Sequence, residues 1–182
     1  MFKEERNTSQ FDWSMIGNIE MGRPNLGRSM DVGVYRLMQF AMRDVLIRNL
    51  DVKTADTVYY QAGELAGRAF CKALLTRDNP FNAFVREVQE LLVEMKIGIL
   101  RVEKADLDTM TFTMTVSEDL DCSGLPMCNE TICTYDEGFI AGLLSEHTGI
   151  EFTAREIDCW CSGARVCRFT VNPVPQDTKP HD

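Results

Sequence analysis

Seven cysteines are the residues of this 182-residue chain best suited to chemistry. Cys159, Cys161 and Cys167 lie close together in the last quarter of the chain, and Cys133 precedes them. With no export signal visible, a reducing compartment is expected, where clustered cysteines more often bind metal than form disulfides. The sequence therefore predicts a cytoplasmic protein with a metal site built mainly from cysteines.

A C-terminal hairpin is predicted to bring two of these cysteines together. Residues 150–161 and 165–171 are predicted to be strands joined by a three-residue loop. Symmetric pairing around that loop places Cys159 opposite Cys167, with Cβ atoms about 4.5 to 5.5 Å apart. This distance suits two thiolates on one zinc ion, because Zn–S bonds are about 2.3 Å long. A cross-strand disulfide is the competing use, and a reducing compartment disfavours it.

Cys133 offers a third thiolate, since it lies near the start of a helix predicted over residues 130–147, where the helix dipole favours the anion. The fourth ligand is open between Glu156 and Cys161. In a regular strand, Cys161 points to the same side as Cys159, whereas Glu156 faces the other side unless a bulge intervenes. Periodicity alone therefore favours Cys161.

Composition argues against several other functions. The formal charge of -9 would repel a polyphosphate backbone, so no direct nucleic-acid partner is expected. No stretch approaches the ~20 apolar residues that cross a membrane. Only His147 and His181 are present, which disfavours chemistry by several histidines. Paired catalytic acids, a nucleophile elbow, a phosphate loop and a dinucleotide fingerprint are not visible, so binding is expected rather than catalysis.

The elements that must position the cysteines follow an α+β pattern. Helical spacing of apolar residues predicts three helices, over residues 31–50, 57–75 and 80–96. A strand around 99–102 and an alternating strand over 109–116 predict an antiparallel hairpin. The expected fold has N-terminal helices packed on an antiparallel sheet, with a helix between two β-hairpins. Gly63 and Gly67, four residues apart, predict the close approach of another backbone.

Three segments are expected along the chain. Residues 1–30 form a polar arm rich in structure-breaking residues, 31–172 form the folded domain, and 173–182 form a polar tail. The arm also carries apolar side chains that are expected to dock on the body or on a second copy: Phe11, Trp13, Met15 and Ile16.

One part of the sequence resembles the vinyl-4-reductase domain. The resemblance is carried by Cys133-Thr-Tyr-Asp-Glu-Gly138-Phe139-Ile140-Ala141-Gly142, by Arg155-Glu156-Ile157-Asp158-Cys159, by Gly163, and by Cys167-Arg168-Phe169-Thr170-Val171. Weaker similarity extends it to about Val32–Val171, including Gly63–Gly67 and Gly98–Leu100. The family includes sensory domains of phenol- and toluene-responsive transcription activators and archaeal proteins described as hydrocarbon-binding.

The resemblance implies a particular structural zinc site. In the aromatic-sensing members three cysteines and a glutamate hold the metal, and the matching positions here are Cys133, Glu156, Cys159 and Cys167. The resemblance thus favours Glu156 as the fourth ligand, with Cys161 as the alternative. The other cysteines are expected to be a core residue and two loop thiols, respectively Cys71, and Cys122 with Cys128.

The resemblance also implies a fold and a pocket. The fold is shared with TRAPP-complex subunits and haem-based nitric-oxide sensors, is commonly dimeric, and encloses an apolar pocket between helices and sheet. The expected pocket residues are Phe84, Met110, Phe112, Met114 and Phe152. Asp136 and Glu137 depart from the apolar pattern expected of their helix. Either they face solvent or the pocket accepts a polar or cationic ligand.

The predicted function is binding or sensing of a small, largely apolar hydrocarbon or aromatic molecule by a zinc-stabilised homodimer. A sensing domain of this kind would signal through its own dimer or through a partner protein that the sequence does not identify. One alternative is a reductase or accessory protein in tetrapyrrole metabolism. Another is a thiol-redox or haem sensor, with His147 as the plausible histidine ligand.

Overall fold

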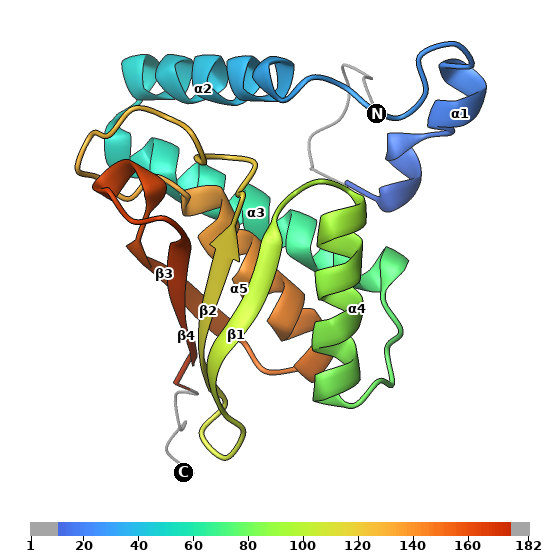
Figure 1. The fold of residues 1–182 in the computed structure, drawn as a ribbon, viewed down its shortest axis with the longest axis vertical. Coiled ribbons are helices and arrows are strands. Elements are labelled where there is room, and N and C mark those ends of the chain that lie inside the picture. The colour runs from blue at the N-terminus through green and yellow to red at the C-terminus, as the bar shows by residue number, and fades with distance from the viewer. Residues whose placement is uncertain (1–10, 176–182) are drawn as a thin grey trace, which may run out of the picture.

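The computed structural model describes residues 11–175. Helices come first, and a helix separates two antiparallel strand pairs (Figure 1). The elements are η1 (Trp13–Ile16), α1 (Ile19–Gly22), α2 (Val32–Asn49), α3 (Val52–Leu74), α4 (Phe81–Glu94), β1 (Ile99–Asp106), β2 (Thr111–Ser117), α5 (Thr134–Thr148), β3 (Phe152–Asp158), η2 (Trp160–Ser162) and β4 (Cys167–Pro173). The α+β fold class and the helix between two hairpins are confirmed.

The four strands form one antiparallel sheet in the order β1-β2-β4-β3. The two central strands pair in register, with Val116 opposite Cys167 and Phe112 opposite Val171. Alternation in β2 places Phe112, Met114 and Val116 in the core, as period-2 patterning dictates. In Figure 1 α5 lies behind this sheet and α3 lies behind α5, so that α5 is covered on both sides.

Four glycines allow α3 and α5 to cross at very short distance. A Cβ atom added at Gly63 would lie 2.0 Å from the backbone oxygen of Tyr135, and one at Gly138 would lie 1.9 Å from that of Tyr60. Gly67 and Gly142 meet the partner helix as closely, at 2.2 and 2.1 Å. The close backbone approach expected at Gly63 and Gly67 is therefore present, and its partner is the helix that begins after Cys133.

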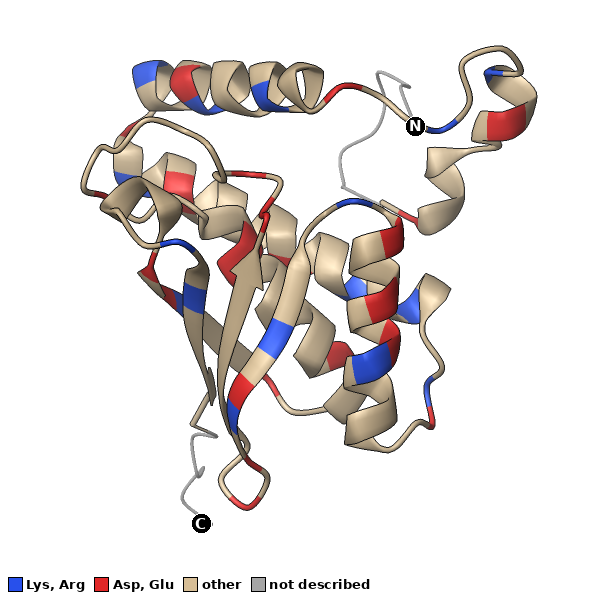
Figure 2. Cartoon of the chain, viewed as in Figure 1, with Lys and Arg blue, Asp and Glu red and all other residues tan. Residues whose placement is uncertain are grey.

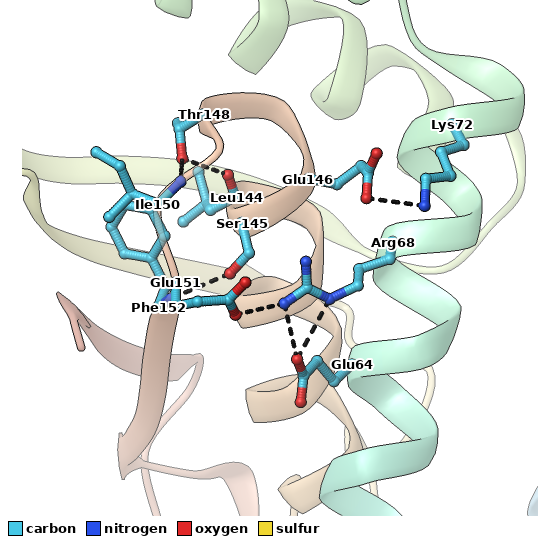
Figure 3. Close-up of polar contacts among 10 residues, drawn as sticks. All are labelled: Glu64, Arg68, Lys72, Leu144, Ser145, Glu146, Thr148, Ile150, Glu151 and Phe152. Atoms are coloured by element: carbon cyan, nitrogen blue, oxygen red, sulfur yellow. Dashed lines mark hydrogen bonds and ion pairs between the residues drawn. The ribbon is translucent and has the colours of Figure 1, made fainter. Parts of the chain in front are cut away.

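Polar contacts fasten the far end of the same crossing (Figure 3). The Arg68 guanidinium on α3 pairs with Glu64 on its own helix and with Glu151, just before β3. The Ser145 hydroxyl on α5 accepts a hydrogen bond from the Phe152 backbone N–H at 3.0 Å. These contacts fix α5 against the first residues of β3, and so fix the distance between the start of α5 and the end of that strand.

Helix α2 presents its polar side to the rest of the chain. The Tyr35 hydroxyl donates to Asp121 at 2.8 Å, and the Arg36 guanidinium donates to backbone oxygens of Leu120 and Ser123 at 2.8 Å. Its apolar side chains face outward and are 48 to 71% exposed: Val34, Leu37, Met38, Met42 and Val45. Figure 1 shows α2 lying apart from the sheet and from α5. The predicted apolar stripe is therefore not part of the core.

Several predicted boundaries are wrong. The second helix begins at Val52 instead of 57, because the Asp51 side chain accepts from the Thr54 N–H and caps it. The fifth helix begins at Thr134 instead of 130. Asn129, predicted as its cap, has a φ of 61° and lies outside it.

The predicted C-terminal hairpin is also wrong in detail. Strand β3 ends at Asp158, and η2 replaces its expected continuation through Cys161. A register shift between Glu156 and Asp158 adds to the difference. The Cα partner of Cys167 is Val116 on β2, so the proximity of Cys159 to Cys167 has another origin than the symmetric pairing that the sequence suggested.

The segment before α2 is only partly an irregular arm. Within residues 11–30, Asp12 caps η1 and Asn18 caps α1. The Trp13 ring packs edge-on against Phe70 of α3, with ring centroids 6.3 Å apart. The parts of the arm and of the tail predicted over residues 1–10 and 176–182 lie outside the described residues.

Charge is mixed along the chain. Lys and Arg alternate with Asp and Glu over most elements in Figure 2, which agrees with the expectation of no basic stripe for nucleic acid. Within residues 11–175, no helix is both long and apolar enough to cross a membrane.

Candidate functional site

Four buried cysteines meet between the start of α5 and the upper end of the sheet. The sulfur atoms of Cys122, Cys133, Cys159 and Cys167 all lie within 4.8 Å of one another, and each residue is at most 1% exposed. The Cys133 sulfur is 3.9 Å from that of Cys159 and 3.8 Å from that of Cys167. Four sulfurs from four separate segments thus converge on one point.

The donor set fits a tetrahedral zinc ion. With Zn–S bonds of about 2.3 Å, two sulfurs on one tetrahedral ion are separated by about 3.8 Å. The two distances from Cys133 match that edge, while the Cys122 and Cys167 sulfurs, 3.0 Å apart, would separate slightly around an ion. Cys133 is also the N-cap of α5, and its side chain makes no capping hydrogen bond, so its sulfur is available. The cluster could hold a metal ion.

Glu156 lies beside this cluster but is not one of its four donors. Its Oε2 accepts a hydrogen bond from the Cys133 backbone N–H at 2.9 Å, and its buried Oε1 has no partner in the described part of the chain. Burial raises the pKa of Glu156 to about 8. The carboxyl therefore holds the start of α5 next to β3, with one oxygen left over.

Cys161 lies in η2, because the strand that would have aimed it at Cys159 ends too early. Its backbone oxygen accepts from the N–H groups of Cys128 and Asn129, each at 2.9 Å. Burial raises the pKa of its thiol to about 12, which favours the protonated form over a thiolate ligand.

Cys122 is the residue that sequence reasoning missed. It was expected to be a loop thiol, but it is fully buried. The Asp119 side chain accepts from the N–H groups of Asp121 and Cys122 and turns the chain inward after β2. Arg36 of α2 holds this turn from outside. The Asp119-x-Asp121-Cys122 spacing is a local turn signal; the contact with α2 leaves no local trace in the sequence.

An apolar cavity of about 40 Å³ lies between α4, α5 and the sheet. Phe84 and Met114, two of the predicted pocket residues, line it. The others lie elsewhere. Phe112 stacks on Phe81 with centroids 4.9 Å apart and contacts Phe152, while Met110 lies at the turn between β1 and β2. The cavity is also lined by aliphatic side chains of both helices and the sheet, including Val88, Leu92, Ile140 and Leu143.

The end of this cavity nearest the cysteines is acidic. Asp119 and Asp136 both contribute to its lining. Burial is the main cause that raises the pKa of Asp119 to about 6 and the pKa of Asp136 well above its usual value. Glu137 points away to the other side, where it accepts from the Glu156 N–H at 2.7 Å. Of the two acids that looked out of place in the sequence, Asp136 is therefore the one at the cavity.

His147 does not line this cavity. Its ring stacks on Phe84, with centroids 3.8 Å apart and an interplanar angle of 11°. Burial lowers its pKa, which favours the neutral ring. The residue closes the aromatic side of the core near the end of α5.

Comparison with known proteins identifies a family in the C-terminal part of the chain. Residues 112–173 match the model of the vinyl-4-reductase domain. Two uncharacterized proteins of Methanocaldococcus jannaschii are similar, one 29% identical over 64% of this chain and the other 26% identical over 82%. The match spans 64% of the first relative, just under two thirds of its length, and 81% of the second.

Solved structures confirm the expected fold. The phenol-responsive sensory domain of the transcription activator PoxR, with phenol, has a TM-score of 0.62 at 14% identity, covering 79% of this chain and 75% of that one. A vinyl-4-reductase family protein of Methanocaldococcus jannaschii scores 0.58 at 19% identity, covering 82% and 85%. A trafficking protein particle complex subunit 3 of Naegleria fowleri, covalently bound to palmitic acid, scores 0.62 at 12%, covering 79% and 95%.

An H-NOX protein of S. oneidensis is also similar, with a TM-score of 0.50 at 12% identity, covering 75% and 74%. At these identities the likeness shows the fold alone. The expectation that this fold is shared with TRAPP subunits and haem-based nitric-oxide sensors is confirmed.

Proposed function

Because this chain carries a vinyl-4-reductase domain in residues 112–173, we propose that it binds, and thereby senses, a small, largely apolar molecule. The observation that carries the proposal is the enclosed cavity between α4, α5 and the sheet, lined almost entirely by apolar side chains. Ligand pockets of this kind are mostly apolar, with a few polar groups that orient the ligand. The phenol-bound sensory domain with the same fold supports a sensing function.

The cavity is small for such a ligand. An apolar cavity of about 150 Å³ holds benzene, so a ring-sized molecule must displace side chains from the 40 Å³ present here. Met114 lines the cavity, and its unbranched thioether side chain adapts easily to a new neighbour. We therefore expect binding to be coupled to rearrangement of the cavity wall.

A cavity-filling variant tests this proposal. Val88→Phe puts a ring into the cavity, so calorimetric titration with toluene should show at least about tenfold weaker binding than the wild type. Val93→Phe makes the same change on the exposed side of α4, where the residue is 54% exposed, and should bind toluene like the wild type. Circular dichroism confirms that both variants are folded. Toluene binding that survives Val88→Phe would place the ligand elsewhere.

We further propose that zinc stabilises the domain, held by Cys133, Cys159 and Cys167 and by a fourth ligand. Cys122 fits that position with only a slight movement of its sulfur away from that of Cys167. Glu156, which the family pattern favours, would have to turn its free Oε1 toward the ion. Thiolate ligands require a reducing compartment, which supports a cytoplasmic protein.

A homodimer is the assembly that best covers the apolar side of α2. Exposed Val34, Leu37, Met38 and Met42 form a stripe along a helix of 18 residues whose polar side is already occupied by the body. A stripe of that size is unusual on a monomer. Two copies of the same stripe are self-complementary around a twofold axis, so each would bury the other.

Substitutions on α2 test the dimer. Leu37→Glu with Met38→Glu should convert the protein to a monomer in analytical ultracentrifugation, because charges cannot be buried without partners. Exchanging the exposed ion pair of Asp44 and Arg48 on the same helix should leave the mass unchanged. A wild-type monomer at micromolar concentration would contradict the proposal.

A thiol-redox function is the second candidate, since the Cys122 and Cys167 sulfurs are 3.0 Å apart. It predicts loss of two titratable thiols on mild oxidation of metal-free protein. A pigment or flavin absorption band in the purified protein would instead favour the role in tetrapyrrole metabolism.

A further inference from the structure

One carboxylate oxygen at the acidic end of the cavity has no partner. Asp136 lines the cavity, and its Oδ2 is fully buried without a hydrogen bond to any residue in 11–175. Every other polar atom lining the same cavity belongs to Asp119 or to the backbone, since the remaining lining side chains are apolar. A polar atom buried without a partner is costly, so a native structure seldom retains one without a use.

The neighbouring acids are already satisfied by the protein. Asp119 accepts from two backbone N–H groups at 2.7 and 3.1 Å. Asp121 accepts from the Tyr35 hydroxyl and the Gln39 amide, both at 2.8 Å. Asp136 alone of the three lacks a donor within the described chain.

No cation of the described residues compensates this group of carboxyls. None of Asp119, Asp121 and Asp136 forms an ion pair in residues 11–175. The guanidinium of Arg36 is directed to backbone oxygens of the turn around Cys122. The acidic end of the cavity therefore has a deficit of positive charge, next to an apolar wall.

We propose that the ligand of this cavity is a hydrophobic amine, whose apolar body lies against α4 and the sheet and whose ammonium group donates to Asp136. The inference rests on the proposed binding function and specifies its ligand class. An ammonium supplies both the hydrogen-bond donor and the charge that the site lacks, and a charge-assisted hydrogen bond is stronger than a neutral one. A neutral hydroxyl would supply the donor alone.

Two other uses of Asp136 compete. A proton held between Asp136 and Asp119 would satisfy the free oxygen without any ligand. The carboxyl oxygens of Asp119 and Asp136 also lie within 4.8 Å of the Cys133 sulfur, which would suit a further metal ion. The three interpretations differ in what Asp136→Asn does, because the amide removes the charge and keeps the size.

The experiment compares three probes of one shape on the full, metal-loaded chain. Benzylamine, which is protonated at pH 7, benzyl alcohol and toluene are titrated by calorimetry into the wild type and into Asp136→Asn. The wild type should bind benzylamine at least about tenfold more tightly than either neutral probe. Asp136→Asn should lose that preference, bind toluene as before, keep its metal content and melt no lower than the wild type. Glu94→Gln, at an exposed position of α4, is the matched control and should behave like the wild type.

Each contrary result has a distinct meaning. If toluene and benzylamine bind equally, the binding function stands and the amine inference is overturned. If none of the three probes binds, the proposed function fails and the inference fails with it. If Asp136→Asn keeps the preference for benzylamine, loses metal or melts at lower temperature, Asp136 serves the fold or a metal, and the inference is wrong.

Discussion

Replacing Cys167 by serine should release the metal and lower the melting temperature by roughly ten degrees or more. The cluster joins four segments that share no continuous element: the turn after β2, the start of α5, the end of β3 and the start of β4. Binding of a structural metal contributes directly to folding free energy. In a domain of this size each kcal/mol changes the melting temperature by about 2 to 4 degrees. Metal content by mass spectrometry and melting by circular dichroism measure the two effects.

Cys71 provides the matched control for this prediction. It is nearly as buried as the cluster cysteines, at 3% exposed, but lies on α3 away from them. Burial raises the pKa of its thiol to about 11, so it is protonated at neutral pH. Cys71→Ser should keep the metal and lose only the stability expected of a small polar change in the core. Equal metal content in Cys167→Ser, Cys159→Ser and Cys71→Ser would contradict the zinc proposal.

The identity of the fourth ligand follows from a second pair of variants. If four thiolates hold the ion, Cys122→Ser should weaken metal binding strongly, whereas Glu156→Gln should retain it, since the amide oxygen still accepts from the Cys133 N–H. If Glu156 is the ligand, the two results exchange. In both cases, removal of metal with a strong chelator should reduce the melting temperature of the wild type to that of Cys167→Ser.

Gly138→Ala should destabilise the protein by about 3 kcal/mol or more, through overpacking of a backbone contact. The new Cβ would lie 1.9 Å from the Tyr60 backbone oxygen, and α3 and α5 would have to separate. In an exposed helix the same change normally stabilises by about 0.5 to 1 kcal/mol, because alanine is the better helix former. The sign of the effect is therefore diagnostic. Urea denaturation of the purified variant measures it, and failure to fold is its extreme form.

Gly22→Ala is the control, because the added methyl group would meet no atom within 4 Å. It should change the free energy of unfolding by less than about 1 kcal/mol. Gly63→Ala, on the opposite helix, should reproduce the effect of Gly138→Ala. If Gly138→Ala and Gly22→Ala are equally stable, α3 and α5 do not cross at the short distance described above.

The separation of α3 and α5 also bears on the metal cluster. Cys133 precedes α5 directly, and Asp136 lies in its first turn. A shift of α5 would move both residues relative to β3 and β4, which carry or precede the other sulfurs. We therefore expect Gly138→Ala to weaken metal binding as well as stability.

Local patterns in the sequence determined most of the secondary structure and the family. Threonine alternation in β2 and helical spacing in α3, α4 and α5 require only neighbouring residues to be read, because each element repeats with its own period. The same holds for Gly63 and Gly67, whose spacing on one helix face indicated a close approach before the partner helix was known. The motif around Cys133, Glu156, Cys159 and Cys167 indicated the vinyl-4-reductase family for the same reason.

Tertiary structure alone decided the features that depend on contacts between distant segments. Cys122 enters the cluster only because Asp119 turns the chain inward and Arg36, 83 to 87 residues away, holds the turn. The apolar stripe of α2 looked like core in the sequence, yet its polar side meets the body, because Asp121 and the turn oxygens lie there. Asp136 is at the cavity while adjacent Glu137 is not, since a helix turns about 100° per residue and only packing selects which side faces inward.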